Sequence, residues 1–486
     1  MNKEIYNLEP KEVWKNFYSL TQIPRPSKHE DKIQDFMVKF GKDLGLETIK
    51  DEVGNVIIRK PATKGMEDRK GVILQGHLDM VPQKNSDKVH DFVKDPIEAY
   101  IDGEWVTANG TTLGSDNGIG VSATMAVLAS KTIAHGPLEA LFTCDEETGM
   151  TGAFGLKPGI LKGDVLINMD SEDEGELYIG CAGGIDLSAS FDYKEEKTDS
   201  KSTSYKLIVK GLKGGHSGVD INLYRGNSNK LLFRFLKKAS LDLGLRISSL
   251  IGGSLRNAVP RESFATVVIP KENENAMIAM VKQFEQDFKK ELSVKEPDLQ
   301  FYCEKTEMPG IVMDFDTQMR VINAVYATPN GVMRMSDDIK GMVETSTNLA
   351  IIQIRNKKVS ISALLRSSVE SAKDDLGEMM CSVYELAGAK YQLEGGYPGW
   401  KPNPNSEILT EMQSIYKNLY GNIPEIKAIH AGLECGLLGS VYTNLDMISF
   451  GPTIRFPHSP DEKVNIATVV KFWNFLLATL KNFPKK

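Results

Sequence analysis

The sequence has few cysteines, no excess of basic residues and no long apolar run, and each shortage excludes a class of protein. Five cysteines in 486 residues, none in a Cys-x-x-Cys pair, argue against a disulfide scaffold or a thiolate zinc finger and favour a reducing cytoplasm. The 58 Lys and Arg against 65 Asp and Glu give a formal charge of −7, which disfavours nucleic acid as a partner. Because eighteen consecutive apolar residues occur nowhere, and residues 1–17 lack an apolar core, neither a membrane span nor a signal peptide is expected.

What is present is typical of a folded chain of several domain-sized units. The hydrophobic content is 41% and the charged content 25%, which are ordinary values for globular proteins. At about 150 residues per domain, the length predicts about three units or two larger ones.

The first part of the chain, residues 1–180, reads as alternating strands and helices. Short apolar runs at 71–75, 138–144 and 164–168 are typical of buried strands, and 118–130 reads as a buried helix that follows a glycine-rich loop. This order predicts an α/β sheet covered by helices on both faces.

The alternation of apolar strands and helices stops at 185–204, a polar stretch that reads as a linker. The pattern that follows has the β-α-β-β-α-β order of a small two-layer α+β domain, so we predict an inserted domain over 186–395, either single or built of two related halves. A turn-rich segment at 395–400 is followed by helices and a strand that resemble the pattern of residues 1–180. The other domain is therefore predicted to be discontinuous, from 1–185 and 396–486.

Polar side chains gather where the predicted strands end. In an open α/β sheet, ligands bind outside the carboxyl ends of the strands, so such residues are expected to converge on one site. They are His77, Asp79, Glu146, Glu147, Asp170 and His458, and Asp116 joins them from just before the predicted helix.

Histidines and carboxylates without thiolates are the ligands expected for two divalent metals that share a bridge. We predict that His77 and Asp170 hold one metal, Glu147 and His458 hold the other, and Asp116 bridges both. Each metal then has three protein ligands and an open position, as a catalytic zinc requires. Two metals (+4), three carboxylates (−3) and a hydroxide (−1) balance in charge. Zn²⁺ is the expected metal, with Co²⁺ or Mn²⁺ as alternatives.

Two further carboxylates have expected roles beside these ligands. Asp79 lies two residues from His77, on the same side of a strand, where it can accept the free ring N–H of His77 and fix its tautomer. Neighbouring residues on an extended chain point in opposite directions, so we expect Glu147 to bind metal while Glu146 stays free as the general base for the water between the metals.

Eight segments together resemble the aminoacyl-histidine dipeptidases, also called Xaa-His dipeptidases, of the di-zinc aminoacylase/carboxypeptidase-like clan. The resemblance runs from about residue 10 to residue 480. The segments are HLDMVPQ (77–83), GSDNGIG (114–120), DEETGMTG (145–152), NMDSE (168–172), KGGHSG (213–218), RNAVPRE (256–262), HAGLECG (430–436) and GPTIRFPHSPDE (451–462).

This resemblance implies an α/β fold in which a mixed-sheet, di-zinc catalytic domain carries an inserted α+β lid domain. It implies the same metal ligands, the same orienting role for Asp79 and the same general base, Glu146, as the residues themselves indicate. It also implies hydrolysis of short unblocked dipeptides with a preference for carboxy-terminal histidine, including β-alanyl-histidine.

The resemblance further implies roles for residues of the lid and beyond. His216 would polarise the scissile carbonyl from a loop with three glycines, acting in its own chain or across a dimer interface. Asn257 and Arg366 would bind the carboxylate end of the substrate; Arg366 follows the apolar run 359–365, where we expect the strand to stop. Glu434 would pair with the free amine of the substrate.

Other functions stay open at this point. An N-acyl amino-acid deacylase, a tripeptide aminopeptidase, and a catalytically silent binding protein on the same fold are the alternatives. The expected partners are a small dipeptide and, through the lid domain, a second copy of the chain, with no nucleic acid and no membrane.

Overall fold

The computed structural model describes residues 3–486, and the chain divides into two compact units. Unit 1 contains the described residues up to Gly180, together with Trp400–Ala428 and Leu433–Lys486. Unit 2 contains Cys181–Gly399 and the short segment Ile429–Gly432. The assignment of 186–395 as a lid domain stays a prediction.

An eight-stranded mixed sheet forms the centre of unit 1, in the order β1-β2-β6-β3-β7-β23-β8-β22. Strands β6, β3, β7 and β23 run parallel, and the pairs β1–β2, β2–β6 and β23–β8 are antiparallel. The three predicted buried strands are confirmed, since β3, β6 and β7 are buried along their whole length. The bounds are β1 Glu47–Lys50, β2 Val56–Lys60, β3 Val72–His77, β6 Leu138–Thr143, β7 Val165–Asn168, β8 Glu176–Cys181, β22 Glu425–Ile429 and β23 Asp446–Ser449.

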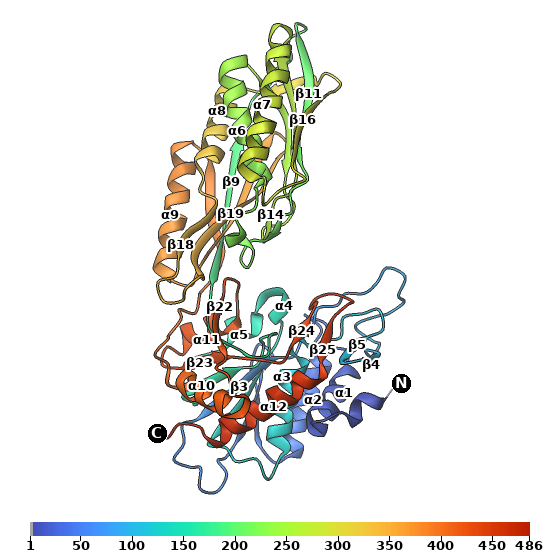
Figure 1. The fold of residues 1–486 in the computed structure, drawn as a ribbon, viewed down its shortest axis with the longest axis vertical. Coiled ribbons are helices and arrows are strands. Elements are labelled where there is room, and N and C mark those ends of the chain that lie inside the picture. The colour runs from blue at the N-terminus through green and yellow to red at the C-terminus, as the bar shows by residue number, and fades with distance from the viewer. Residues whose placement is uncertain (1–2) are drawn as a thin grey trace. The chain divides into compact units, whose positions relative to one another are not determined.

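Helices surround this sheet, as buried parallel strands require (Figure 1). The predicted helix over 118–130 is α3, which is buried on nearly every side and is entered through Gly114 at φ +71°. Amphipathic α1 instead buries one stripe that includes Trp14 and Phe17. The bounds are α1 Lys11–Thr21, α2 Asp31–Asp43, α3 Ser115–Ala129, α4 Glu146–Gly149, α5 Thr151–Gly155, α10 Glu407–Tyr420, α11 Glu434–Val441, α12 Ile466–Lys481 and the 3₁₀ helix η1 Lys3–Asn7.

A separate four-stranded sheet of unit 1, in the order β24-β25-β5-β4, joins two distant parts of the chain. Strand β25 pairs with both β24 and β5. The hairpin β24–β25 and the segment that leads from β5 into α3 are therefore both anchored in this small sheet. The bounds are β4 Ala99–Asp102, β5 Trp105–Ala108, β24 Ile454–Arg455 and β25 Lys463–Asn465.

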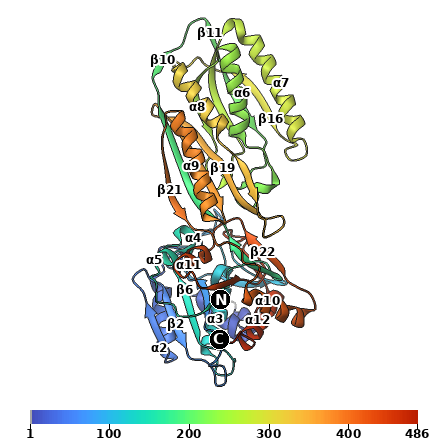
Figure 2. The same ribbon diagram turned by 90° about the vertical axis from the view of Figure 1, so that its left-hand side faces the viewer.

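Unit 2 is an antiparallel sheet with a layer of four helices, α6 to α9 (Figure 2). The sheet order is β16-β11-β15-β13-β19-β20-β9-β21, with β18 also paired to β19. The core lies between sheet and helices, where Phe233, Phe235, Phe288 and Phe301 are fully buried. Two small pairs, β12–β14 and β10–β17, complete the unit.

The elements of unit 2 are the strands β9 Gly183–Asp192, β10 Glu195–Lys197, β11 Ser202–Lys210, β12 Gly215–His216, β13 Arg246–Gly252, β14 Ala258–Val259, β15 Ser263–Pro270, β16 Gln300–Lys305, β17 Ile311–Met313, β18 Gly331–Met335, β19 Val343–Arg355, β20 Lys358–Ser367 and β21 Lys390–Tyr397. The helices are α6 Ser228–Leu243, α7 Glu274–Leu292, α8 Phe315–Ala327, α9 Glu370–Leu386, and the 3₁₀ helices η2 Ile221–Leu223 and η3 Lys271–Asn273.

Two predictions of irregular chain are wrong. The supposed linker at 185–204 contains most of β9, all of β10 and the start of β11, and the turn-rich segment at 395–400 begins inside β21. Both segments are polar, which led to the wrong prediction of loops. In fact β9 alternates buried and less buried residues, and β21 is an exposed edge strand. Such strands bury apolar residues on one face only. Across residues 3–486, no helix is both long and apolar enough to cross a bilayer.

Candidate functional site

The carboxyl ends of the central strands of unit 1 bring the predicted ligands together. His77 is the last residue of β3, and Asp170 follows β7 by two residues. Glu147 lies in α4, just after β6, and Asp116 lies in the first turn of α3. His458 lies in the loop that joins β24 to β25.

These five residues form two groups that share Asp116. In the first group, Nε2 of His77 lies 3.1 Å from Oδ1 of Asp116 and 3.4 Å from Oδ1 of Asp170. In the second, Nε2 of His458 lies 3.3 Å from Oδ2 of Asp116 and 3.0 Å from Oε2 of Glu147. Within each group one ligand atom per residue lies within 4.8 Å of the others. Asp116 thus offers one carboxylate oxygen to each group.

The charges in the two groups strongly affect one another. Burial is the main cause that raises the pKa of Asp170 to about 8, and burial also raises the pKa of Glu147. Burial opposes ionisation of Asp116 as well, but hydrogen bonds with His458 and His77 outweigh it and lower the pKa. Hydrogen bonds with Asp116 and Glu147 raise the pKa of His458 to about 11. Crowded carboxylates that are costly to ionise are an environment that a cation would stabilise.

The donor set fits a pair of divalent cations. Two buried carboxylate oxygens, Oε1 of Glu147 and Oδ1 of Asp170, accept no hydrogen bond among the described residues. A buried oxygen without a donor is costly unless a cation or water satisfies it. Each group combines one imidazole with two carboxylates, the ligand types that suit zinc and related metals.

Asp79 lies beside His77, the residue that it is predicted to orient. It is fully buried, and its Oδ1 lies 3.2 Å from Nδ1 of His77. That approach is not a hydrogen bond, since Nδ1 of His77 has no hydrogen-bond partner among residues 3–486. The carboxylate accepts hydrogen bonds from Oγ of Ser27 at 2.7 Å and from the backbone N–H groups of Glu146 and Glu147 at 3.0 and 3.2 Å. A proton on Nδ1 of His77 leaves Nε2 free to bind a metal.

Glu146 lies beside the predicted ligands and its role stays a prediction, but the reasoning that made it a free carboxylate is wrong in one step. Glu146 and Glu147 do not lie on extended chain; they begin the one-turn helix α4, after Asp145 in the left-handed region. Successive side chains on a helix differ by about 100° in direction, not 180°. The side chains of Glu146 and Glu147 therefore both reach within 4.8 Å of His77. Burial is the main cause that raises the pKa of Glu146 well above its usual value.

Two residues that support the site were missed in the sequence. Arg25 is buried and donates from Nη1 to the carbonyls of Leu78 and Asp79 and from Nη2 to that of Gly114. Glu462 is buried and accepts hydrogen bonds from the loop before α3. Nothing in the sequence around Arg25 indicates this role. Glu462 could have been considered, because it is the last residue of the segment GPTIRFPHSPDE, which contains His458.

Glu434 begins α11 and is fully buried in unit 1. Its Oε2 accepts hydrogen bonds from Nε2 of Gln75 at 2.6 Å and from Oγ1 of Thr143 at 2.7 Å, and its Oε1 accepts none among residues 3–486. Burial is the main cause that raises its pKa to about 7. Pairing with a substrate amine, which stays a prediction, would therefore fall to Oε1.

In unit 2, the loop around His216 fixes the direction of its ring. Gly214 and Gly215 both have positive φ, and β12 pairs with β14. Nδ1 of His216 accepts hydrogen bonds from the backbone N–H groups of Gly218 and Val219, both at 3.1 Å. The neutral ring therefore carries its proton on Nε2, which makes Nε2 a donor. Burial and then repulsion by Arg366 lower the pKa of His216 and favour this neutral form.

The other two predicted substrate residues also belong to unit 2. Arg366 does not emerge from the end of a strand as expected, because β20 continues to Ser367. Arg366 is 5% exposed, donates from Nη1 to Oη of Tyr397 at 2.9 Å and has no partner for Nε among the described residues. Asn257 is exposed, and its backbone carbonyl accepts from the N–H of Ser217.

A second histidine of unit 2, His430, was not assigned a role. Its Nε2 lies 2.7 Å from Oγ of Ser346, and its backbone carbonyl would lie 2.0 Å from a Cβ at Gly218, which is why a side chain there would clash. Burial, followed by repulsion from Arg366 and His216, lowers the pKa of His430 to about 3. The segment HAGLECG contained this residue, but nothing in its spacing distinguished it from a packing histidine.

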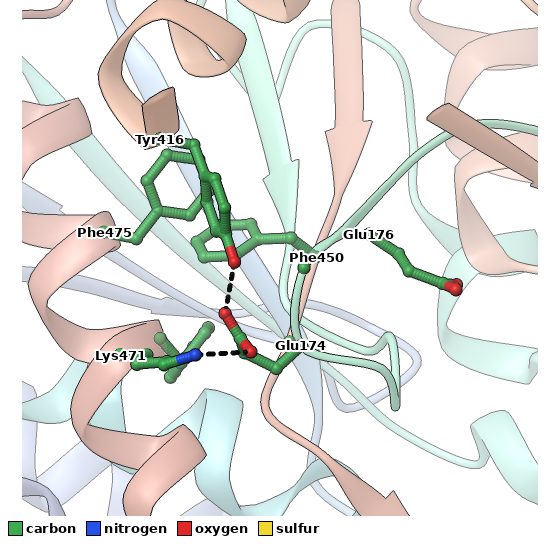
Figure 3. Close-up of a pocket in the computed structure, with 9 residues that line it drawn as sticks. Glu174, Glu176, Tyr416, Phe450, Lys471 and Phe475 are labelled. Atoms are coloured by element: carbon green, nitrogen blue, oxygen red, sulfur yellow. Dashed lines mark hydrogen bonds and ion pairs between the residues drawn. The ribbon is translucent and has the colours of Figure 1, made fainter. Parts of the chain in front are cut away.

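A second cavity of unit 1, shown in Figure 3, is too small to be the substrate site. It measures about 10 Å³, about the space of one water molecule, and lies beside Phe450. Its charged groups already have partners. Glu174 accepts from Oη of Tyr416 at 2.5 Å and from Nζ of Lys471 at 3.1 Å, and Glu176 accepts from Oη of Tyr178 at 2.6 Å. A dipeptide does not fit there.

The chain is similar to known proteins over nearly its whole length. A sequence model for the family described as "Peptidase family M20/M25/M40" matches residues 73–482. The chain is 48% identical to the cytosol non-specific dipeptidase of Escherichia coli strain K12, over 99% of this chain and 100% of that protein. It is also similar to the crystal structure of an aminoacylhistidine dipeptidase from Vibrio alginolyticus, with 51% identity, a TM-score of 0.94 and 99% of each chain covered. A tripeptidase from Staphylococcus aureus, at 16% identity and a TM-score of 0.57 over 98% of each chain, shares the fold alone.

Proposed function

The chain belongs to peptidase family M20/M25/M40, and from this membership we propose that it is a metal-dependent dipeptidase that hydrolyses unblocked dipeptides, Xaa-His and β-alanyl-histidine among them. The observation that carries the metal dependence is the shared carboxylate of Asp116, which lies 3.1 Å from His77 through one oxygen and 3.3 Å from His458 through the other. Two full-length relatives named as dipeptidases support the proposal.

Two Zn²⁺ ions are the metals we propose. His77, Asp116 and Asp170 would hold one, and Asp116, Glu147 and His458 the other. Bound there, the metals would supply Lewis acidity towards the scissile carbonyl.

The side chains of the chain itself supply the remaining steps. Glu146 would accept a proton from the attacking water and return it to the leaving amine, a role that suits a carboxyl whose pKa burial has raised. Asp79 would hold His77 in one tautomer. From unit 2, Nε2–H of His216 would donate a hydrogen bond to the oxygen that becomes negative in the transition state.

Substrate ends would be recognised by fixed charges. Arg366, with its unpartnered Nε, and Asn257 would bind the carboxylate end, because a guanidinium and an amide donate well to carboxylate oxygens. Oε1 of Glu434 would accept from the free amine. We also propose a cytosolic location, as the name of the Escherichia coli relative has it. A homodimer through the lid predicted over 186–395 is a further part of the proposal.

The test combines a substrate panel with metal analysis. We expect about two Zn²⁺ per chain, loss of dipeptide hydrolysis on chelation and recovery on addition of Zn²⁺. Free dipeptides should be cleaved in preference to N-acetylated dipeptides and tripeptides. Full activity in metal-free protein would contradict the two-metal centre, and a preference for N-acetylated substrates would make the protein a deacylase.

A further inference from the structure

Glu462 binds the loop that carries Asp116 through an unusual number of hydrogen bonds. Its side chain is 2% exposed. Oε2 accepts from the backbone N–H groups of Leu113 at 2.7 Å and Gly114 at 2.9 Å. Oε1 accepts from the backbone N–H of Ser115 at 2.7 Å, from its Oγ at 2.6 Å and from the N–H of Asp116 at 3.3 Å. One carboxylate therefore gathers four consecutive amides.

This contact joins two loops that start from the same small sheet. Strand β5 leads into the loop of Asp116, and the hairpin β24–β25 carries His458 in its connecting loop. Glu462 is the residue before β25, and its backbone carbonyl accepts from Oγ1 of Thr107 in β5 at 2.8 Å. The backbone of Glu462 is therefore bonded to β5, and its side chain binds the loop that follows β5.

The local chemistry makes the contact hard to replace. The four amides flank the start of α3, with Leu113 and Gly114 before it and Ser115 and Asp116 in its first turn. Backbone N–H groups at the start of a helix lack partners in the helix and favour a negative charge. Gly114 is held from the opposite side by Arg25, which donates to its carbonyl. An amide in place of the carboxylate would put an N–H₂ donor against backbone donors, and buried donors without acceptors are costly.

We propose that Glu462 is a positioning residue that sets the spacing between Asp116 and His458, and with it the affinity of the metal position formed by Asp116, Glu147 and His458. The inference rests on the proposed two-metal function. The other position depends on Glu462 less, because two of its three residues, His77 and Asp170, follow from the central strands β3 and β7.

The experiment is a titration of metal-free protein with Zn²⁺ in competition with a chromophoric chelator. In Glu462→Gln, we expect one Zn²⁺ to bind with nearly the wild-type affinity and the second about 10- to 100-fold more weakly, the usual effect of residues that orient ligands. The matched control is Glu139→Gln, in the same unit. Glu139 is 6% exposed and accepts from the backbone N–H groups of Lys162 at 2.7 Å and Gly163 at 2.9 Å, but it lies near the start of β6 rather than at its carboxyl end. Glu139→Gln should lower the melting temperature and leave both affinities unchanged.

A double-mutant cycle identifies which metal position is affected. If Glu462 acts through the position of His458, then Glu462→Gln should add little to the loss of metal caused by His458→Ala, whereas independent effects would add. Should Glu462→Gln fail to fold, Glu462→Asp takes its place, since it keeps the charge but withdraws it by one methylene, and a selective loss at one position is again expected. Two wild-type affinities in the folded variant, or additive losses in the cycle, would overturn the proposal for Glu462. Wild-type protein that binds no Zn²⁺ would instead contradict the proposed function.

Discussion

The proposed catalytic side chains of unit 1 and those of unit 2 lie in different kinds of surroundings. In unit 1, Asp79 is fully buried and accepts hydrogen bonds from three other residues. In unit 2, Asn257 is exposed, and buried Arg366 has one N–H group without a partner among the described residues. The residue that would orient a metal ligand is thus fixed from several sides, whereas the residues that would meet substrate are exposed or keep a donor free.

This difference follows from what each set must do. A metal position needs its ligands within a few tenths of an ångström before the ion arrives, so surrounding hydrogen bonds must hold them there. A group that recognises substrate contributes only if its donors are free to bind the ligand. The histidines differ as well: hydrogen bonds with carboxylates raise the pKa of His458 to about 11, while burial, followed by repulsion from Arg366, lowers the pKa of His430 to about 3.

The largest effect that tests the comparison is expected for Glu146 in unit 1. Glu146→Gln keeps the shape of the side chain but removes its capacity to accept a proton, so kcat should fall by about 10²- to 10⁴-fold. Steady-state kinetics on a free dipeptide measures this, and metal analysis should find the same content as in wild type. A variant that loses metal would show that Glu146 is a ligand, as its distance of at most 4.8 Å from the ligand atom of His77 allows.

A somewhat smaller loss is expected for His216 in unit 2. His216→Ala removes the Nε2–H donor, and loss of one donor to a developing negative charge typically lowers kcat by about 10²- to 10³-fold. KM and metal content should stay close to wild type, because the ring would act only in the transition state. Exposed His29 provides the control, and His29→Ala should change neither constant.

Mixing two inactive variants sharpens the same prediction. If the chain dimerises and His216 acts across the interface, mixed dimers of His216→Ala and Glu146→Gln should recover activity, because one site then has both residues. Absence of recovery in proven mixed dimers would assign the histidine to its own chain. A kcat near the wild-type value in His216→Ala would remove the donor role altogether.

The third effect should appear in KM rather than in kcat. Arg366→Ala removes hydrogen bonds to a carboxylate, each worth about 1.5–3 kcal/mol, so KM for free dipeptides should rise about 10- to 100-fold. Dipeptide amides, which lack that carboxylate, should be affected far less. Arg334, which pairs with Asp337 on the surface of the same unit, supplies an arginine control in Arg334→Ala. Equal damage to both substrates would mean that Arg366 only supports the fold.

That several proposed ligands lie together was predictable where they follow buried apolar strands, while their role as ligands stays a prediction. His77 and Asp170 could be placed at one edge of the sheet since the parallel strands before them end together. The contacts that hold this set could not be predicted. Glu462 binds amides 346 to 349 positions earlier in the chain, and hydrogen bonds to the backbone leave no pattern in the side chains they join.

In unit 2 the sequence was less informative for a related reason. Its sheet faces helices on one side, so strands such as β21 are largely polar and read as loop. Arg366 appeared to end a strand because a charge followed an apolar run, but the pairing of β20 with β9 continues through Arg366 to Ser367. Charged residues inside a strand become predictable only when the cross-strand neighbours are known.

The smallest effect concerns the neutral histidines of unit 2 and shows itself in stability. The pKa of His430 is lowered to about 3, first by burial, so between pH 6.5 and pH 3 the unfolded chain binds a proton that the folded chain does not. Stability from this group is therefore complete above about pH 6.5 and falls as the pH decreases, by up to about 1.4 kcal/mol per pH unit. Urea unfolding followed by circular dichroism at pH 7.0 and 5.5 should show a loss about 1 kcal/mol smaller in His430→Asn than in wild type. Ser346→Ala, which removes the 2.7 Å contact with Nε2 but keeps the imidazole, should retain the wild-type pH dependence. If His430→Asn retains it too, the imidazole of His430 takes up its proton in the folded state as readily as in the unfolded chain, and unit 2 does not exclude charge from its histidines.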